Sequence, residues 1–404
     1  MAGSSLGSGV TETGGLYVHV PFCSAICPYC DFAVARGGAA DTERFVEALL
    51  ADIDRCGSGG REGGWTGEAA RFEALRFDTV YLGGGTPSAL SLEQLEAVRL
   101  RLDGVFDIDD GAEWTIEVNP EDASPESLAG CCELGFDRIS LGLQALDDRA
   151  LRFLGRRHDA AEARASVGRA REAGFRSVSI DLIYSAPGFD ADWWLRTLDE
   201  AAALGADHLS CYELTIHHGT PFGRRRDAGR LRETGEDERA ANFVATHRRL
   251  GGLGYEGYEV SNFARREADR SRHNRKYWRH VPYLGLGPSA HSFDGRRRSW
   301  NIAPWKRWCD AVDGGRSPVA DVEQLTDRDL LLEAVMMGLR QRSGVDCASL
   351  EERFGFDPAV GNAPQIEAWE RTGWLRVTGR RLQPTLEGMA RADRLAAEWE
   401  LPES

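Results

Sequence analysis

The sequence predicts an α/β protein in which short strands alternate with helices along the first half of the chain. Two observations favour this class. Six short apolar segments, each bounded by turn residues, recur between residues 16 and 214, and stretches with helical periodicity separate them. Strands joined in this way require right-handed crossovers and form a parallel sheet. Six units are too few for a closed eight-stranded barrel, and a doubly wound sheet is the alternative arrangement.

The six candidate strands are rich in β-branched and aromatic residues and have the short lengths typical of buried parallel strands. In order along the chain they cover residues 16–20, 79–82, 114–118, 138–143, 177–183 and 208–214.

The helical stretches between them begin at acidic or hydroxyl-bearing residues and end at glycine, as helix caps do. The start signals are Asp41, the capping-box pair Ser91 and Gln94, and the pair Ser124 and Pro125, and the stop signals are Gly174 and Gly205.

Four parts are expected along the chain. Residues 1–15 are dominated by Gly, Ser and Thr and predict a flexible tail, and residues 16–250 hold the strand–helix units. Residues 251–319, rich in aromatic and basic side chains, do not repeat the unit and are read as an extension of it. Residues 320–404 predict a small separate domain of short helices with a β-like pair at 374–377 and 382–384.

The formal net charge of −15 over 404 residues argues against a general nucleic-acid binder, which needs a basic field. No apolar run reaches the roughly 18 residues of a membrane span, and no signal-peptide pattern opens the chain. Nine cysteines, an odd number, without a secretion signal fit a reducing compartment. We therefore expect a cytoplasmic protein without a transmembrane segment.

Three cysteines carry the most specific signal in the chain. Cys23, Cys27 and Cys30 lie within eight residues of one another, a spacing expected by chance at a frequency of roughly 0.005. Three thiolates suit a four-iron cluster, because one iron is then left open to a small molecule. The alternatives are a zinc site that takes His19 as its fourth ligand, and buried thiols without a metal.

The pattern Cys-x3-Cys-x2-Cys followed by an aromatic region resembles the radical S-adenosylmethionine (SAM) superfamily. The flanking residues 17–22, Tyr-Val-His-Val-Pro-Phe, are similar to the branch that contains the oxygen-independent coproporphyrinogen III oxidases and the HemW-type heme chaperones. The resemblance implies an open (β/α)6 barrel over residues 16–250 and a smaller winged-helix-like C-terminal domain. It also implies that Cys23, Cys27 and Cys30 bind a [4Fe-4S] cluster whose open iron is chelated by SAM. In that family the reduced cluster cleaves SAM to a 5′-deoxyadenosyl radical.

Residues 83–87, Gly-Gly-Gly-Thr-Pro, follow the second strand, where a ligand can approach the backbone closely. Such a run is an ordinary turn when taken alone, and no lysine makes it a phosphate loop. In this context it resembles the GGGTP element of the family, which implies that Gly84, Gly85 and Thr86 contact the amino group of SAM.

Polar residues also end several of the later strands. Glu117 could accept the hydroxyls of a ribose or be an exposed strand carboxylate, and Asp181 lies in so apolar a strand that it needs a partner or ligand. Gln144 closes the fourth strand, and Arg156 is expected on the helical segment after it. The resemblance implies that these four residues and Tyr17 contact SAM. Only a barrel would bring such strand ends together.

Two features decide between members of the family. The oxidases have a fourth cysteine two positions after the third, where this chain has Phe32. Residues 273–278, His-Asn-Arg-Lys-Tyr-Trp, match the HNxxYW motif associated with heme binding in HemW-type chaperones, although alone they would read as a polar loop. Imidazole is an axial ligand of heme iron, and aromatic rings pack on a porphyrin. The motif implies heme contacts by His273, Asn274, Tyr277 and Trp278, with His273 as the iron ligand and His291 as the other candidate.

The resemblance therefore implies a heme chaperone that holds a [4Fe-4S] cluster, SAM and heme and passes heme to acceptor proteins, respiratory ones among the candidates. The cluster then need not turn over a substrate. The competing readings are an oxygen-independent coproporphyrinogen III oxidase and a radical SAM methyltransferase. A homodimer and peripheral contact with a membrane are left open.

Overall fold

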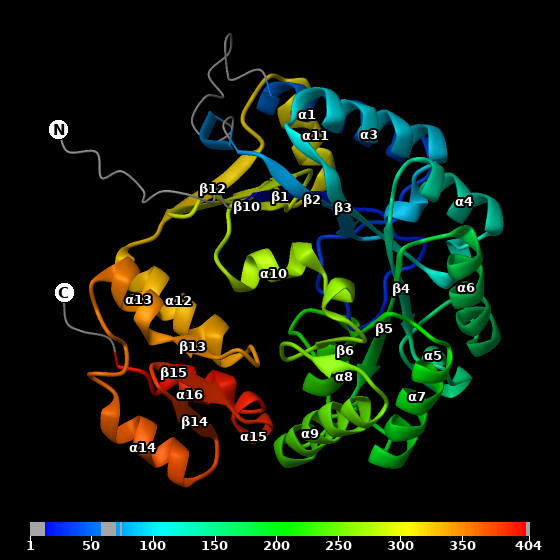
Figure 1. Cartoon of the computed structure of the whole chain (residues 1–404). Coiled ribbons are helices and arrows are strands. Elements are labelled where there is room, and N and C mark those ends of the chain that lie inside the picture. The colour runs from blue at the N-terminus through cyan, green and yellow to red at the C-terminus, as the bar shows by residue number, and fades with distance from the viewer. Residues whose placement is uncertain (1–12, 58–69, 73–74, 401–404) are drawn as a thin grey trace, which may run out of the picture.

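The computed structural model describes residues 13–57, 70–72 and 75–400. A single sheet of twelve strands forms the centre of the molecule, in the order β12-β11-β10-β9-β1-β2-β3-β4-β5-β6-β8-β7 (Figure 1). Its middle six strands follow one another in chain order and pair in parallel. They are β1 (Gly14–Val20), β2 (Phe77–Gly84), β3 (Ile108–Val118), β4 (Arg138–Gln144), β5 (Ser177–Tyr184) and β6 (His208–Glu213).

All six strands expected from the apolar segments are present, and the α/β class with an open parallel sheet is confirmed. The expected tail falls largely on residues 1–12, which lie outside the described residues. Its end was misplaced, because Gly14 and Gly15 belong to β1. The Gly14 N–H donates to the Arg76 carbonyl at 2.7 Å, and the Gly15 N–H donates to the Pro282 carbonyl at 3.1 Å. Two glycines give no apolar signal, so the sequence did not indicate that the strand begins at Gly14.

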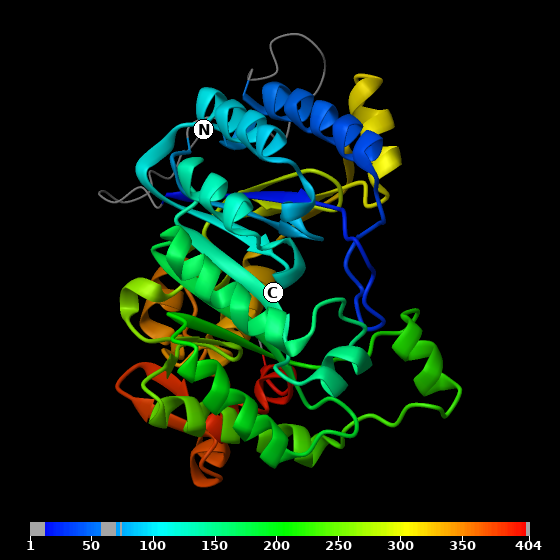
Figure 2. The same ribbon diagram turned by 90° about the vertical axis from the view of Figure 1, so that its right-hand side faces the viewer.

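Helices cover the outer face of the parallel strands (Figures 1 and 2). The expected capping box forms, since the Ser91 side chain accepts from the Gln94 N–H and the Gln94 side chain accepts from the Ser91 N–H. Ser124 caps the helix that Pro125 opens, and Gly174 ends another helix in the left-handed region, with φ 100°. These helices are α1 (Ala39–Gly57), α3 (Leu92–Val105), α4 (Pro125–Glu133), α5 (Asp148–Phe153), α6 (Ala160–Ala173) and α7 (Ala191–Ala203). Short 3₁₀ turns are η1 (Ala70–Phe72), η2 (Pro87–Ala89), η3 (Pro120–Asp122) and η4 (Glu267–Asp269).

The segment after β6 extends the sheet at both edges. Strand β8 joins β6 in antiparallel pairing, whereas β9 pairs in parallel with β1 at the opposite edge. Helix α10 lies across the inner side of the sheet, between the sheet and the C-terminal domain (Figure 1). The elements are α8 (Pro221–Asp227), α9 (Glu236–Gly252), β7 (Glu256–Gly257), β8 (Asn262–Ala264), α10 (Arg272–Trp278), β9 (Tyr283–Leu286), β10 (His291–Phe293), β11 (Arg297–Asn301), α11 (Trp305–Asp313) and β12 (Val319–Gln324).

Strand β12 pairs with β11 and so belongs to the large sheet, although residues 320–324 were expected in the C-terminal domain. Most of its side chains are exposed, so its sequence lacks the apolar alternation that reveals a strand. The remaining elements form a small domain with its own apolar core and a three-stranded sheet in the order β13-β15-β14. They are α12 (Asp327–Leu339), β13 (Val345–Asp346), α13 (Cys347–Phe354), α14 (Ala363–Arg371), β14 (Leu375–Thr378), β15 (Arg381–Pro384), α15 (Leu386–Met389) and α16 (Ala392–Ala397).

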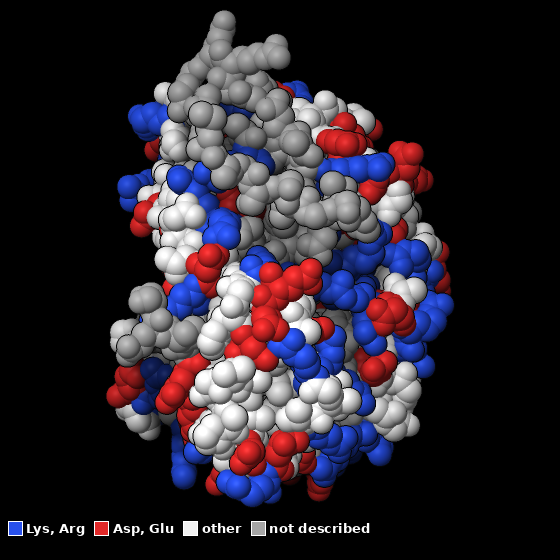
Figure 3. All heavy atoms as spheres, turned by 60° about the vertical axis from the view of Figure 1, so that its left-hand side comes forward, with Lys and Arg blue, Asp and Glu red and all other residues white. Residues whose placement is uncertain are grey.

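Two surface properties bear on the expectations about partners. Within the described residues, no helix has the length and apolar content to cross a membrane. Among the described residues on the face shown in Figure 3, acidic and basic side chains are interspersed.

Candidate functional site

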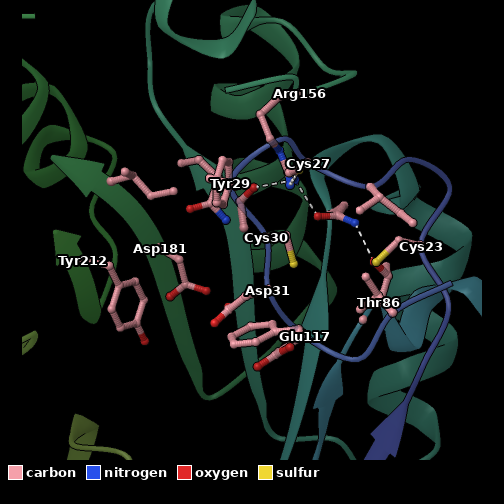
Figure 4. A pocket seen from close by; sticks show the side chains of 18 of the residues that line it. Cys23, Cys27, Tyr29, Cys30, Asp31, Thr86, Glu117, Arg156, Asp181 and Tyr212 are labelled. Carbon is pink, nitrogen blue, oxygen red and sulfur yellow. Dashed lines mark hydrogen bonds between the residues drawn. The ribbon is translucent and has the colours of Figure 1, made fainter. Parts of the chain in front are cut away.

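The carboxyl ends of the parallel strands and the loop after β1 enclose a cavity of about 430 Å³, which we call the cysteine cavity (Figure 4). Its volume lies in the range of ligand sites. Ten residues expected at the site line it: Cys23, Cys27, Cys30, Gly84, Gly85, Thr86, Glu117, Gln144, Arg156 and Asp181. These residues come from widely separated parts of the chain.

The cysteine loop is fixed by backbone hydrogen bonds. The Cys23 N–H donates to the Ala35 carbonyl at 3.0 Å, and the Cys30 N–H donates to the Cys27 carbonyl at 3.1 Å. At the far end of the loop the Phe222 N–H, at the start of α8, donates to the Pro28 carbonyl at 2.9 Å. The loop is therefore held in place by its own backbone and by α8.

Donors from the segments after β2 and α5 reach two of the sulfur atoms. The Thr86 hydroxyl donates to Cys23 Sγ at 3.5 Å, and the Arg156 guanidinium donates to Cys27 Sγ at 3.4 Å. Burial raises the pKa of the Cys23 thiol, which the Thr86 hydrogen bond opposes, and burial raises the pKa of Cys30 to about 11. Donors directed at sulfur suit thiolates, the form in which cysteine binds metal. The donor set therefore fits an iron–sulfur cluster.

The geometry fits a zinc ion poorly. Among the described residues, no group of three or more His, Cys, Asp and Glu side chains is arranged to hold a single metal ion. His19, the expected fourth zinc ligand, uses both ring nitrogens elsewhere: Nδ1 bonds the Tyr17 hydroxyl and Nε2 bonds the Ala33 carbonyl, each at 3.1 Å. A four-iron cluster has a different requirement, since each thiolate binds an iron of its own.

The glycines at the end of β2 allow a close backbone approach. Gly84 has φ 103°, and a Cβ there would lie 2.3 Å from His19 Nδ1. A Cβ on Gly85 would lie 2.6 Å from the Phe22 carbonyl oxygen and 2.7 Å from that of Val20. A side chain at either position would push the strand end away from the cysteine loop.

Two half-buried carboxyl groups point into the cavity from β3 and β5. Glu117 accepts from the Tyr81 hydroxyl at 2.7 Å and from the Gly84 N–H at 3.2 Å. Burial raises the pKa of Glu117 to about 7, and the nearby Asp181 adds to the effect. Asp181 accepts from the Ser140 hydroxyl at 3.1 Å, and burial raises its pKa as well. Strongly perturbed carboxyl groups in a cavity are typical of binding sites.

Arg156 was expected on a helix, but it lies just after the turn that ends α5. The helix ends because Gly155 adopts the left-handed region, with φ 70°. From this turn the guanidinium also donates to the Asn119 side-chain oxygen at 2.5 Å and to the Gly142 carbonyl at 3.0 Å. Gln144, at the end of β4, has φ 66°, a conformation that non-glycine residues adopt mainly at constrained sites.

Asn119 was missed by sequence reasoning. It lines the cavity, accepts from Arg156 and donates to the Thr86 hydroxyl at 2.9 Å, so it connects the donors that reach Cys23 and Cys27. The available signal was its position two residues after Glu117, directly after β3, where polar side chains gather at the carboxyl ends of strands.

A second cavity, of about 470 Å³, adjoins the first, and we call it the side cavity. Both cavities are lined by Asp31, Phe32, Gly84 and Glu117. Tyr17 lies in this side cavity rather than in the cysteine cavity. The other lining residues are His19, Ala33, Tyr277, Tyr283, Ser289 and His291.

The four HNxxYW residues do not share one cavity. Tyr277 reaches the side cavity, but His273 is 1% exposed and lies among the strands beneath it. His273 Nδ1 bonds the Thr79 hydroxyl at 2.9 Å, and Nε2 bonds the Tyr277 hydroxyl at 2.8 Å. Trp278 accepts through its carbonyl from Gln341, at the junction with the C-terminal domain, and Asn274 donates through its N–H to the Ser271 cap. Neither of these two lines a cavity described above.

The fold and much of the sequence are shared with known proteins. Residues 17–201 match the family model of the Radical SAM superfamily, and residues 325–391 match that of the HemN C-terminal domain. The chain is 35% identical over 382 residues to the heme chaperone HemW of Mycobacterium tuberculosis, covering 94% of this chain and 93% of the relative. The HemW of Bacillus subtilis is 31% identical over 340 residues, covering 84% of this chain and 86% of the relative.

The coproporphyrinogen III oxidase (HemN) from Escherichia coli has the same fold, with a TM-score of 0.80 at 23% identity over 96% of this chain and 90% of that one. The resemblance seen in the cysteine signature and the HNxxYW motif is confirmed by the relatives, which match along most of the chain. The chain therefore belongs to the family of the heme chaperone HemW, within the radical SAM superfamily.

Proposed function

We propose that this protein is a heme chaperone, which holds a [4Fe-4S] cluster and SAM in the cysteine cavity, binds heme beside them and passes it to acceptor proteins. The observation that carries the proposal is the convergence of three cysteines, a glycine-rich strand end and two half-buried carboxyl groups on one cavity. The relatives matched over most of the chain are heme chaperones by name. The nine free cysteines suit a reducing compartment, and we place the protein in the cytoplasm.

Cys23, Cys27 and Cys30 are proposed to supply the three thiolates of the cluster. Arg156 is the one arginine or lysine among the residues that line the cysteine cavity, and it offsets the negative charge that three thiolates bring. When bound, the cluster supplies one iron without a protein ligand, at which SAM is held. Its binding requires the loss of the thiol protons, and so it weakens as the pH falls.

The polar residues around the cavity suit the parts of SAM. The backbone at Gly84 and Gly85, with Thr86, is proposed to receive the amino group, because these three residues line the cavity together with the cysteines. The Glu117 carboxylate is proposed to accept the ribose hydroxyls. Gln144, Arg156 and Asp181 complete the proposed contacts in the cysteine cavity, whereas Tyr17, which lines the side cavity, is not among them.

Heme is proposed to enter from the side cavity, where Phe32, Tyr277 and Tyr283 provide aromatic surface. Phe32 is 66% exposed, and so large an exposed apolar side chain at a cavity suggests a ligand that covers it. The HNxxYW helix α10 is proposed to contribute to this site through Tyr277.

Anaerobic hemin binding by the cluster-loaded protein tests the proposal. We expect a Soret band for bound hemin and the transfer of that hemin to an apo heme protein such as apomyoglobin. Cluster-loaded Phe32→Ala protein should bind hemin more weakly, whereas Phe356→Ala, a change in the C-terminal domain, should bind like wild type. The formation of protoporphyrinogen from coproporphyrinogen under anaerobic turnover would instead identify an oxidase.

A further inference from the structure

The histidine of the HNxxYW motif has no free nitrogen with which to bind iron. An axial ligand offers an unshared lone pair on one ring nitrogen, but the Thr79 and Tyr277 hydroxyls engage both ring nitrogens of His273. The ring is also tightly packed, because a Cβ on Gly15 would lie 3.1 Å from its Cε1 atom. Binding iron here would require two hydrogen bonds to break and the buried ring to move.

His291 has the opposite properties. It is exposed and lines the side cavity at the first position of β10. Within the described part of the chain, neither of its ring nitrogens has a hydrogen-bond partner. Its ring stacks on Trp300 of the neighbouring strand, with centroids 5.7 Å apart and planes at 26°. This stacking orients the imidazole and leaves its edge available to a ligand.

The backbone before His291 holds the side chain at this place. Ser289 adopts the left-handed region, with φ 61°, and a Cβ on Gly285 would lie only 2.1 Å from the His291 carbonyl oxygen. The glycine is therefore required where β9 and β10 approach each other, and the turn between these strands delivers the imidazole to the cavity.

We propose that His291 is the axial ligand of the heme iron in the side cavity, and that His273 is a positioning residue that fixes the Tyr277 hydroxyl. This inference rests on the proposed function and names the residue that binds its cargo. Phe32, Tyr277 and Tyr283 provide aromatic surface for the porphyrin in the same cavity. Asp31 and Glu117 are the carboxylates that line it.

The protonation state of His291 agrees with this role. The protein atoms around the imidazole displace part of its water, which lowers its pKa below the usual value, and the nearby Arg298 guanidinium lowers the pKa further. The imidazole is therefore neutral near pH 7, as an iron ligand must be.

The test is a hemin titration of the cluster-loaded full chain, followed by the Soret band and by the spin state of the iron in electron paramagnetic resonance. In His291→Ala we expect the histidine-ligated spectrum to disappear and the hemin dissociation constant to rise by about tenfold or more. Loss of a residue that only supports a metal ligand already weakens metal binding by about tenfold or more. Added imidazole should restore the spectrum. His218→Ala, at a histidine side chain that is 90% exposed, is the matched control and should bind like wild type.

His273→Gln keeps a side chain that can bond Thr79 and Tyr277, so it avoids the packing loss of an alanine. We expect it to retain the histidine-ligated spectrum. A wild-type spectrum in His291→Ala, or its loss in His273→Gln with restoration by imidazole, would overturn the assignment while leaving the chaperone function standing. A wild-type protein that binds no hemin would overturn both.

Discussion

Replacing Glu117 with glutamine tests the ribose-binding role proposed for the carboxylate that β3 carries into the cysteine cavity. Glu117 accepts hydrogen bonds from the Tyr81 hydroxyl and the Gly84 N–H, and it is half-buried. Hydrogen bonds to a charged group contribute roughly 1.5–3 kcal/mol, and about 1.4 kcal/mol corresponds to a tenfold change in affinity. We therefore expect Glu117→Gln to bind SAM about 10- to 100-fold more weakly.

The pH dependence provides an independent check. The pKa of about 7 means that the carboxyl group is protonated below pH 7 in the SAM-free protein, and only the ionised form accepts both ribose hydroxyls. SAM affinity should therefore fall as the pH is lowered below 7, by about tenfold for each pH unit well below the pKa. Glu117→Gln should lose this dependence between pH 6 and 8.

The assay is equilibrium dialysis of SAM against the reconstituted, unreduced protein, with the cluster absorbance recorded alongside. Asp110→Asn is the matched control, because it makes the same carboxyl-to-amide change at an exposed position of the same strand. Asp181→Asn should weaken SAM binding in the same direction. Equal SAM affinity and the same pH profile in wild type and Glu117→Gln, with the cluster intact, would refute the assigned role.

Three further changes test other parts of the account. Arg156→Gln removes a half-buried cation that donates a hydrogen bond to Cys27. The reduction potential of the cluster should therefore fall in a redox titration followed by electron paramagnetic resonance, and an unchanged potential would contradict the charge-balancing role of Arg156. Gly85→Ala places a methyl group within 2.7 Å of two backbone oxygens, so chemical denaturation should show a loss of roughly 1–3 kcal/mol, whereas an equally stable variant would refute the close approach. Burial raises the pKa of Glu259 to about 7 from an ordinary 4.5. Between these two pH values the folded chain holds a proton that the unfolded chain releases. The stability of the wild type therefore falls as the pH rises from about 4.5 to 7 and beyond. Glu259→Gln should therefore be more stable than wild type at pH 8 by up to roughly 3 kcal/mol and equal to it at pH 4, and a pH-independent difference in denaturation would contradict this.

The parallel strands were predictable because a buried strand is a short run of apolar residues in the sequence. The convergence of their ends was predictable because parallel strands end at the same edge of a sheet. Glu117, Gln144 and Asp181 could be placed at one edge of a sheet without knowing any contact. Strand β12 was assigned to the wrong unit, because an exposed edge strand has no apolar pattern. Arg156 was expected on a helix because the sequence does not show that Gly155 adopts a left-handed conformation and ends α5 before it. This turn is what brings Arg156 to Cys27.

Contacts between distant segments were not predictable. The four-residue spacing of His273 and Tyr277 puts them on one face of a helix, where the structure shows them hydrogen-bonded to each other. Nothing in that spacing says that this face is buried against β1 and β2. The parallel pairing of β9 with β1 joins segments more than 260 residues apart. His291 reaches the side cavity from β10, which pairs with β9.

The content of iron and acid-labile sulfide in anaerobically prepared protein shows whether Cys23, Cys27 and Cys30 hold a cluster. We expect about four irons and four sulfides per chain, the composition of a [4Fe-4S] cluster, and their loss in Cys27→Ser. Protein that contains zinc and no acid-labile sulfide would contradict this expectation.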